Sequence, residues 1–233
     1  MPHRLVLFDI DGTLIMSAGY KNEFNRAIEE TVGPGNATPA GIRFAGNTDP
    51  QIAAAALRAL GIEESKIYEK VDNVLRRYEA LISESRLPGS LTDNVLPGVH
   101  ELIQRLQSID RVSIGLLTGN IKLGAKSKLE AAGLNHYFDF GVFGDDHSDR
   151  YKMPEIAQNR AEKEFGKTFE KKQIVVIGDT IHDVNCGKSI GVRSIAVATG
   201  YEDAGVLMAE NPDFYFSSLS DTDTVIEAIL EML

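Results

Sequence analysis

The chain has 233 residues, of which 43% are hydrophobic and 25% charged, a balance typical of a globular protein with a sizeable core and not of a disordered or fibrous one. Its formal net charge of −10, without any long basic run, makes nucleic acid and anionic membrane surfaces unexpected partners. The single cysteine, Cys186, rules out an internal disulfide, and no apolar run reaches the roughly 18 residues of a membrane helix, so we expect a soluble protein of the cytoplasm.

The first predicted element is a buried strand at residues 4–8, within the stretch RLVLFDIDGTLI. Two acidic residues, Asp9 and Asp11, follow it with a single isoleucine between them. Residues two apart on a strand point to the same side, so both carboxylates can converge at the carboxyl end of this strand. Two like charges this close need a cation or a proton between them, which predicts a metal or acid–base site.

Residues 16–94 contain no good strand candidate and predict a helical insertion. Amphipathic helices are expected in 49–61 and 63–85. In the second, one apolar stripe recurs at three- and four-residue steps: Ile67, Val71, Val74, Tyr78 and Leu81. The segment 87–98 is expected to be the hinge that returns the chain. We therefore predict a helical domain at 16–94 and a second domain made of 1–15 and 95–233.

From residue 95 onward, strand and helix patterns alternate. Apolar runs predict strands at 112–117, 140–143, 174–178, 194–197 and 214–216. Helical periods occur in 100–109, 121–133, 153–166 and 182–191. Gly133 and Gly191 follow the last periodic residues of their segments, as at many helix C-termini. The alternation predicts an α/β fold, a doubly wound and mostly parallel sheet with helices on both faces.

A second acidic site follows the predicted strand at 174–178, where Asp179 and Asp183 occur in GDTIHD. The carboxyl ends of strands are where doubly wound sheets bind ligands. If this strand neighbours the first, four carboxylates surround one cavity. Such a set of hard oxygen ligands suits Mg²⁺, which binds a few carboxylates together with water and phosphate.

Other strand ends supply groups that can bind an anion. Thr118, Gly119 and Asn120 come just before a helix, where a hydroxyl and backbone N–H groups can hold a phosphate. Arg150 and Lys152 precede the helix that begins near Pro154. A metal, an anion cradle and a cation around a carboxylate predict a phosphoryl-transfer site.

In such a site Asp9 is the expected nucleophile, which forms an aspartyl-phosphate. Asp11 is expected to protonate the leaving oxygen and then to deprotonate the attacking water. The order DIDGT, TGN, a basic residue before a helix, and GDTIHD resembles the motif order of the haloacid dehalogenase-like (HAD) superfamily of phosphohydrolases. The resemblance spans almost the whole chain. It implies a Rossmann-like core and a cap domain formed by the helical insertion.

The resemblance also implies a role for each matching residue. Asp9 is nucleophile and metal ligand, and Asp11 is the acid/base and offers its backbone carbonyl to the metal. Asp179 binds Mg²⁺. Thr118 and the basic residue hold the phosphate, while Asp183 supports the ligand shell or orients the basic residue. The expected activity is that of a Mg²⁺-dependent phosphatase for small phosphorylated metabolites, with phosphoglycolate as a first candidate.

One departure concerns the basic residue, because the Gly-Lys-Pro common in capped phosphatases of this family is missing. Arg150 and Lys152 straddle the expected position, and we favour Arg150. The two are not equivalent, since arginine binds an anion through a fixed fork and lysine as a point charge. In the cap segment 44–52, candidate substrate contacts are Asn47, Thr48 and Asp49.

Two alternatives to a phosphatase stay open. A phosphomutase like β-phosphoglucomutase would keep Asp11 and return the phosphoryl group to a sugar held by the cap. The basic residue that such mutases place near the cap segment is missing here, unless Arg43 serves. A non-catalytic relative that binds phospho-ligands would share the fold. The sequence predicts neither the oligomeric state nor the physiological substrate.

Overall fold

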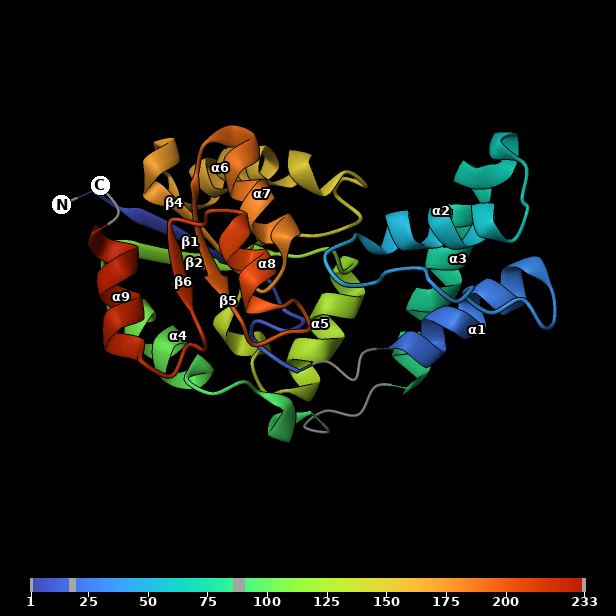
Figure 1. Ribbon diagram of the computed structural model, residues 1–233, viewed down its shortest axis with the longest axis horizontal. Helices are drawn as coiled ribbons and strands as arrows, with labels where there is room; N and C mark the ends of the chain where they lie inside the picture. The colour runs from blue at the N-terminus through green and yellow to red at the C-terminus, as the bar shows by residue number, and fades with distance from the viewer. Residues whose placement is uncertain (1, 17–19, 86–90, 232–233) are drawn as a thin grey trace.

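The computed structural model describes residues 2–16, 20–85 and 91–231, and its centre is one six-stranded sheet (Figure 1). The strands run in the order β3-β2-β1-β4-β5-β6, and every neighbouring pair is parallel. They are β1 (Arg4–Phe8), β2 (Val112–Leu117), β3 (Gly141–Val142), β4 (Ile174–Gly178), β5 (Arg193–Val197) and β6 (Phe214–Phe216). The predicted doubly wound parallel sheet is confirmed, with β3 shorter than expected.

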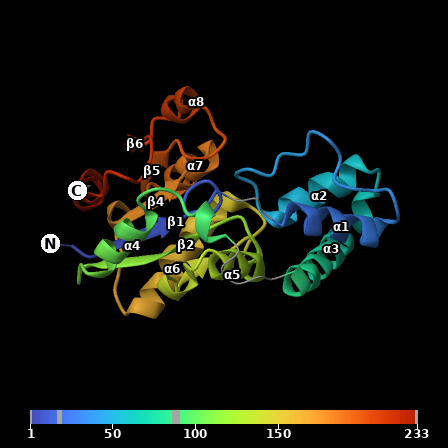
Figure 2. The ribbon, with the colours of Figure 1, turned by 90° about the horizontal axis from the view of Figure 1, so that it is seen from below.

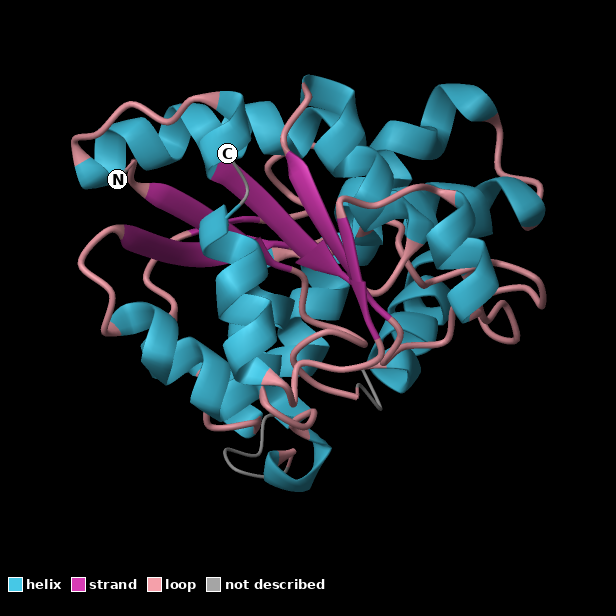
Figure 3. Cartoon of the chain, turned by 60° about the vertical axis from the view of Figure 1, so that its left-hand side comes forward, coloured by secondary structure: helices cyan, strands magenta, loops and turns pink. Residues whose placement is uncertain are grey.

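Helices connect the strands and cover both faces of the sheet (Figure 3). They are α1 (Lys21–Val32), α2 (Asp49–Ala59), α3 (Glu64–Ser85), α4 (Val99–Gln107), α5 (Lys122–Ala131), α6 (Met153–Phe165), α7 (Ile181–Ile190), α8 (Ala204–Ala209) and α9 (Thr222–Glu231). Gly133 and Gly191 lie just past α5 and α7 with φ of 72° and 74°, the left-handed conformation that commonly ends a helix. None of the described helices combines the length and apolar character needed to cross a membrane.

Side chains of β1 divide between two apolar layers, one on each face of the sheet. Val6 and Phe8 join the layer formed with α4, α5 and α9, whereas Leu5 and Leu7 join the layer formed with α6 and α7. All of β1 is buried. A strand covered on both faces reads as a continuous apolar run, which is the pattern that the sequence has there.

The inserted helices α1, α2 and α3 pack around a separate hydrophobic cluster, which Ile121 at the start of α5 also joins, and they lie to one side of the sheet (Figure 2). The segment that runs from the sheet to the inserted helices lies beside the segment that returns from them. Ile15 and Val95 form an antiparallel bridge between the two. The Met16 backbone N–H also donates to the Asn94 carbonyl at 2.7 Å. These contacts lie at the predicted boundary, and the division into two domains stays a prediction. Residues 87–90 of the predicted hinge lie outside the described residues.

α1 is not among the helices that the apolar pattern predicts. It buries only Phe24, Ala27 and Ile28, a stripe too short to distinguish it from a loop in the sequence. These residues pack in the cluster shared with α2 and α3. Short helices are marginal on their own in water, so tertiary packing is what stabilises α1.

Candidate active site

The carboxyl ends of three adjacent strands meet at one cavity. Asp9 follows β1, Thr118 follows β2 and Asp179 follows β4, and β1 lies between the other two. The cavity has a volume of about 330 Å³. The predicted site residues that line it are Asp9, Asp11, Asn47, Asp49, Thr118, Gly119, Asn120, Arg150 and Asp179. The parallel sheet therefore gathers at one edge side chains that are far apart in the sequence.

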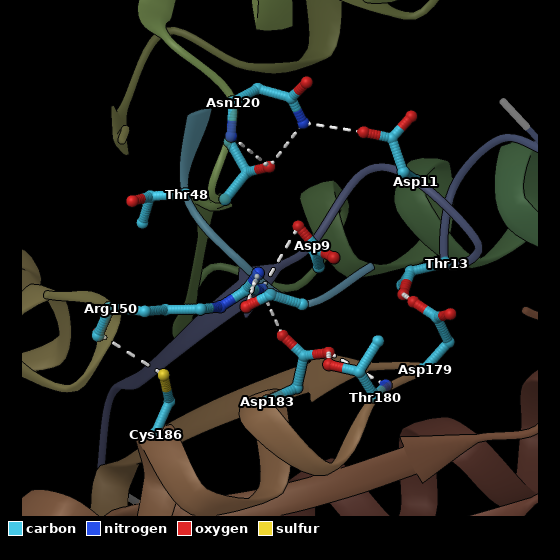
Figure 4. Close-up of polar contacts among 12 residues, drawn as sticks. Asp9, Asp11, Thr13, Thr48, Asn120, Arg150, Asp179, Thr180, Asp183 and Cys186 are labelled. Carbon is cyan, nitrogen blue, oxygen red and sulfur yellow. Dashed lines mark hydrogen bonds and ion pairs between the residues drawn. The ribbon is translucent and has the colours of Figure 1, made fainter. Parts of the chain in front are cut away.

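Three buried carboxylates form a tight group at this edge (Figure 4). Oxygen atoms of Asp9, Asp179 and Asp183 all lie within 4.8 Å of one another. Burial raises the pKa of both Asp9 and Asp179, and the charge of Asp183 raises them further, although Arg150 opposes the effect at Asp9. Carboxylates this crowded are stabilised by a cation between them, and an all-oxygen donor set fits a hard divalent ion.

The backbone after β1 holds the Asp179 carboxylate in place. Thr13 donates its hydroxyl to Asp179 Oδ1 at 3.2 Å. Gly12 has a φ of +85°, and a Cβ there would lie 2.3 Å from Asp179 Oδ2. Any side chain at position 12 would therefore displace this carboxylate, and glycine is the residue that adopts the positive φ at no steric cost.

Arg150 is the cation that contacts Asp9, and it is buried to 3% exposure between the carboxylates of Asp9 and Asp183. Its guanidinium lies 3.4 Å from Asp9 Oδ1, forms a close ion pair with Asp183, and donates to the Gly46 carbonyl at 3.2 Å. Burial by itself lowers the pKa of Arg150. The negative charges of Asp183 and Asp9 outweigh this effect, so the pKa of Arg150 is raised above its ordinary value. Its Nε is buried without a hydrogen-bond partner among the residues that the structure describes.

The structure does not bring Lys152 to this site. Lys152 is exposed at the position that caps α6, whereas Arg150, two residues earlier, points into the cavity. Asp183 is fixed from the other side, since its Oδ2 accepts hydrogen bonds from the backbone N–H and the hydroxyl of Thr180 at the start of α7. Asp183 thereby orients Arg150 toward Asp9 (Figure 4).

Asp11 lines the same cavity but its carboxylate turns away from the acidic group. The chain leaves strand geometry after Phe8, so the predicted convergence of Asp9 and Asp11 on one point does not occur. Asn120 donates to Asp11 Oδ2 at 2.7 Å and to Thr118 Oγ1 at 2.9 Å. This chain of hydrogen bonds joins the end of β1 to the end of β2.

Lys128 on α5 completes the arrangement and was not among the predicted site residues. Its Nζ donates to Asp11 Oδ1 at 2.9 Å, to Asp11 Oδ2 at 2.6 Å and to Asn120 Oδ1 at 2.6 Å. Because this helix contains several lysines, the buried one was not recognised as a site residue. The helical phase could have found it, because Lys128 lies three and four residues after Ala125 and Gly124, on the face made of small residues.

Replacing Lys128 with Met should lower the free energy of unfolding by about 1–3 kcal/mol, because Asp11 and Asn120 would lose a shared charged donor. The effect is smaller than for a fully buried ion pair, since the Asp11 side chain is 33% exposed. Urea denaturation would measure it. Lys126→Met is the matched control on the same helix: Lys126 is 55% exposed and pairs with Glu130 at 3.8 Å, and its loss should cost well under about 1 kcal/mol. Equal losses in both variants would contradict a structural role for the buried contacts.

The cap segment lies directly on the core. The Asp49 N–H donates to the Gly119 carbonyl at 2.8 Å, and its Oδ2 accepts from the Ile121 N–H at 2.8 Å. Thr48 donates its hydroxyl to the Ser148 carbonyl at 2.8 Å and is fully buried. Of the predicted cap contacts, Asn47 and Asp49 reach the cavity, whereas Thr48 joins cap to core. Burial raises the pKa of Asp49 to about 6.

Comparison with known proteins agrees with this geometry. The family model described as haloacid dehalogenase-like hydrolase matches residues 6–197. "Probable phosphatase IndB" of Dickeya dadantii is 29% identical over 232 residues, covering 98% of this chain and 95% of the relative. "Phosphoglycolate phosphatase 1" of Pseudomonas aeruginosa is 28% identical over 222 residues, covering 94% of this chain and 78% of the relative.

Solved structures share the fold. One described as a predicted phosphoglycolate phosphatase from Haemophilus somnus superposes with a TM-score of 0.69 at 20% identity, covering 96% of this chain and 98% of the other. A β-phosphoglucomutase from Clostridium difficile gives a TM-score of 0.68 at 17% identity, covering 99% and 98%. The family match over most of the chain, together with the acidic site at the carboxyl edge of the sheet, means that the chain belongs to the haloacid dehalogenase-like hydrolases.

Proposed function

We propose that the protein is a Mg²⁺-dependent phosphatase that hydrolyses small phosphomonoesters through an aspartyl-phosphate on Asp9. The observation that carries this proposal is the position of Asp9, buried in the cavity and 3.4 Å from the Arg150 guanidinium. A carboxylate placed beside a buried cation is positioned to receive a phosphoryl group and to have its charge balanced. The similarity to relatives named as phosphatases supports the same reading.

The proposed reaction has two steps. A carboxylate oxygen of Asp9 attacks phosphorus, the bond between phosphorus and the leaving oxygen breaks, and Asp11 gives that oxygen a proton. Asp11 then takes a proton from a water molecule, whose oxygen attacks the aspartyl-phosphate and releases inorganic phosphate and the Asp9 carboxylate. Asp11 therefore enters the first step as the carboxylic acid and the second as the carboxylate, and Lys128 and Asn120 hold its side chain at the cavity.

The phosphate is proposed to lie between Arg150, Thr118 and the backbone of Gly119 and Asn120. The residues that would hold Mg²⁺ are Asp9, Asp179 and the backbone carbonyl of Asp11. When bound, the ion would neutralise charge on the phosphoryl oxygens. The cap (16–94) would exclude bulk water from the cavity.

A phosphomutase is less well supported, because it needs a cation that holds a second phosphate on the substrate. Arg43, the candidate for that role, forms a close ion pair with Glu202 and does not line the cavity. The likeness to β-phosphoglucomutases stands below 25% identity and concerns the fold. We therefore favour water over a sugar as the final acceptor.

Phosphate release from a panel of small phosphomonoesters tests the function. With Mg²⁺ we expect turnover of at least one ester, and with a chelator we expect the rate to fall by about 100-fold or more. Turnover that survives chelation would contradict the metal dependence. A panel without any turnover, in a protein that binds Mg²⁺, would contradict the phosphatase.

A further inference from the structure

The side of the cavity that faces the catalytic carboxylates is made of aromatic and apolar side chains from the cap. Those that line it are Tyr20, Phe24, Phe44, Ile52 and Tyr78, which come from α1, α2, α3 and the connecting segments. The Phe24 ring lies 5.5 Å from the Phe44 ring and 5.0 Å from the Tyr78 ring between centroids, both in edge-to-face geometry. Phe24 and Tyr78 are 1% and 3% exposed, whereas Phe44 is partly exposed, and we call the three rings together the aromatic wall.

The cations that line the cavity leave little to hold a second acidic group of a substrate. Arg150 is engaged by Asp9 and Asp183, and Lys128 by Asp11. The remaining lining cation, within the described part of the chain, is Lys21, whose Nζ lies over the Phe44 ring at 5.4 Å from its centroid. On the cap side Asp49 adds a carboxylate, which would repel a substrate acid. The wall is therefore poorly suited to a leaving group such as a short hydroxy acid.

We propose that the aromatic wall binds the leaving group, and that the preferred substrates are phosphomonoesters of alcohols that carry an uncharged planar ring. This inference rests on the proposed phosphatase function. The cavity volume of about 330 Å³ lies at the lower end of the range for pockets that enclose whole small molecules, with room beyond a phosphate. Aromatic rings pack on one another by edge or by offset face, which favours a flat ring over a flexible chain.

Tyr78 is the wall residue that carries a polar group. Its side chain is 3% exposed, and burial together with the negative charges of Asp49 and Asp11 raises the pKa of its hydroxyl well above the usual range. Of the apolar lining residues, Phe44 is partly exposed, while Phe24 and Ile52 are almost fully buried beside it.

Initial rates on matched esters test the proposal. Benzyl, cyclohexylmethyl and ethyl phosphate release alcohols of similar acidity, so differences in kcat/KM report binding of the leaving group and not its chemistry. We expect kcat/KM for benzyl phosphate to exceed that for ethyl phosphate and for phosphoglycolate by about tenfold or more, and to exceed that for cyclohexylmethyl phosphate. Phosphoglycolate as the better substrate would overturn the proposal, and a selective loss of that activity in Lys21→Met would show that Lys21 binds its carboxylate instead.

Variants of the wall give the second comparison. Phe44→Leu keeps an apolar side chain and removes the ring, so it should lower the benzyl-to-ethyl ratio of kcat/KM by about 2- to 10-fold. Tyr68→Leu is the matched control, because Tyr68 lies on the same cap and is 83% exposed away from the cavity lining. An equal change of the ratio in both variants would overturn the assignment of the wall.

A binding measurement separates this inference from the proposed function. Benzylphosphonate and ethylphosphonate cannot be hydrolysed by the proposed route, and calorimetric titration with Mg²⁺ gives their dissociation constants without turnover. Tighter binding of benzylphosphonate by about tenfold would support the wall even if no ester were hydrolysed. Equal affinities would overturn it, whatever the rates on esters.

Discussion

Asp9→Asn should lower phosphate release by about 10⁴-fold or more and leave the protein folded. An amide oxygen is too weak a nucleophile to take the phosphoryl group, while its shape matches that of the carboxylate. The substitution also removes one negative charge from the crowded group formed with Asp179 and Asp183. Because burial raises the pKa of Asp9, the charge is costly to bury in the metal-free protein, and the melting temperature should stay equal or rise.

Phosphate release and thermal melting by circular dichroism would measure both effects on the same preparation. Intact mass must first exclude deamidation of the new asparagine back to aspartate. Asp139→Asn, an exposed position away from the cavity lining, is the control and should behave like the native protein. More than about 1% residual turnover in homogeneous Asp9→Asn would rule out Asp9 as the nucleophile.

Arg150→Met should lower kcat/KM by about 10²- to 10³-fold, because the phosphate would lose its buried cation. It should also lower the free energy of unfolding by about 3–5 kcal/mol, since the carboxylates of Asp9 and Asp183 would be left without their partner. Steady-state kinetics and urea denaturation measure the two effects. Arg150→Lys keeps the charge but not the fork, so it should recover stability more than activity.

Lys152→Met is the direct comparison, because the sequence leaves the choice between the two basic residues open. Lys152 is exposed and does not line the cavity, so its loss should change kcat/KM by less than about twofold. A large loss of activity in this variant, with little loss in Arg150→Met, would reverse the assignment of the phosphate-binding cation.

The sheet and its acidic edge could be predicted because they follow from short local patterns. Continuous apolar runs identify strands covered on both faces, and parallel strands deliver the residues after them to one edge. Asp9, Thr118 and Asp179 could therefore be placed together from their positions alone. The prediction required that β1 and β4 be neighbours, which the sequence did not show. In the structure the two strands pair directly.

The site residues that the sequence did not place correctly are positioned by tertiary packing. Lys128 is buried because α5 turns one face toward Asp11; the helical phase places it on the face of small residues, but only the tertiary fold shows that Asp11 lies opposite. Thr48 was expected near the substrate, yet the docking of the cap turns its hydroxyl to Ser148. Which side chain enters a cavity is decided by contacts between distant segments, and these have no signature in one segment alone.

The place of β1 in the middle of the sheet has a consequence for how the protein is made. Residues 4–8 are synthesised before the other strands, but their partners in the sheet are residues 112–116 on one side and 174–177 on the other. The helices of residues 20–85 can pack with one another long before that. Until β4 has been synthesised, β1 has an unpaired edge, which invites pairing with other chains. The acidic group is also incomplete until Asp179 and Asp183 exist, so a nascent chain carries Asp9 without the buried carboxylates that surround it in the folded protein.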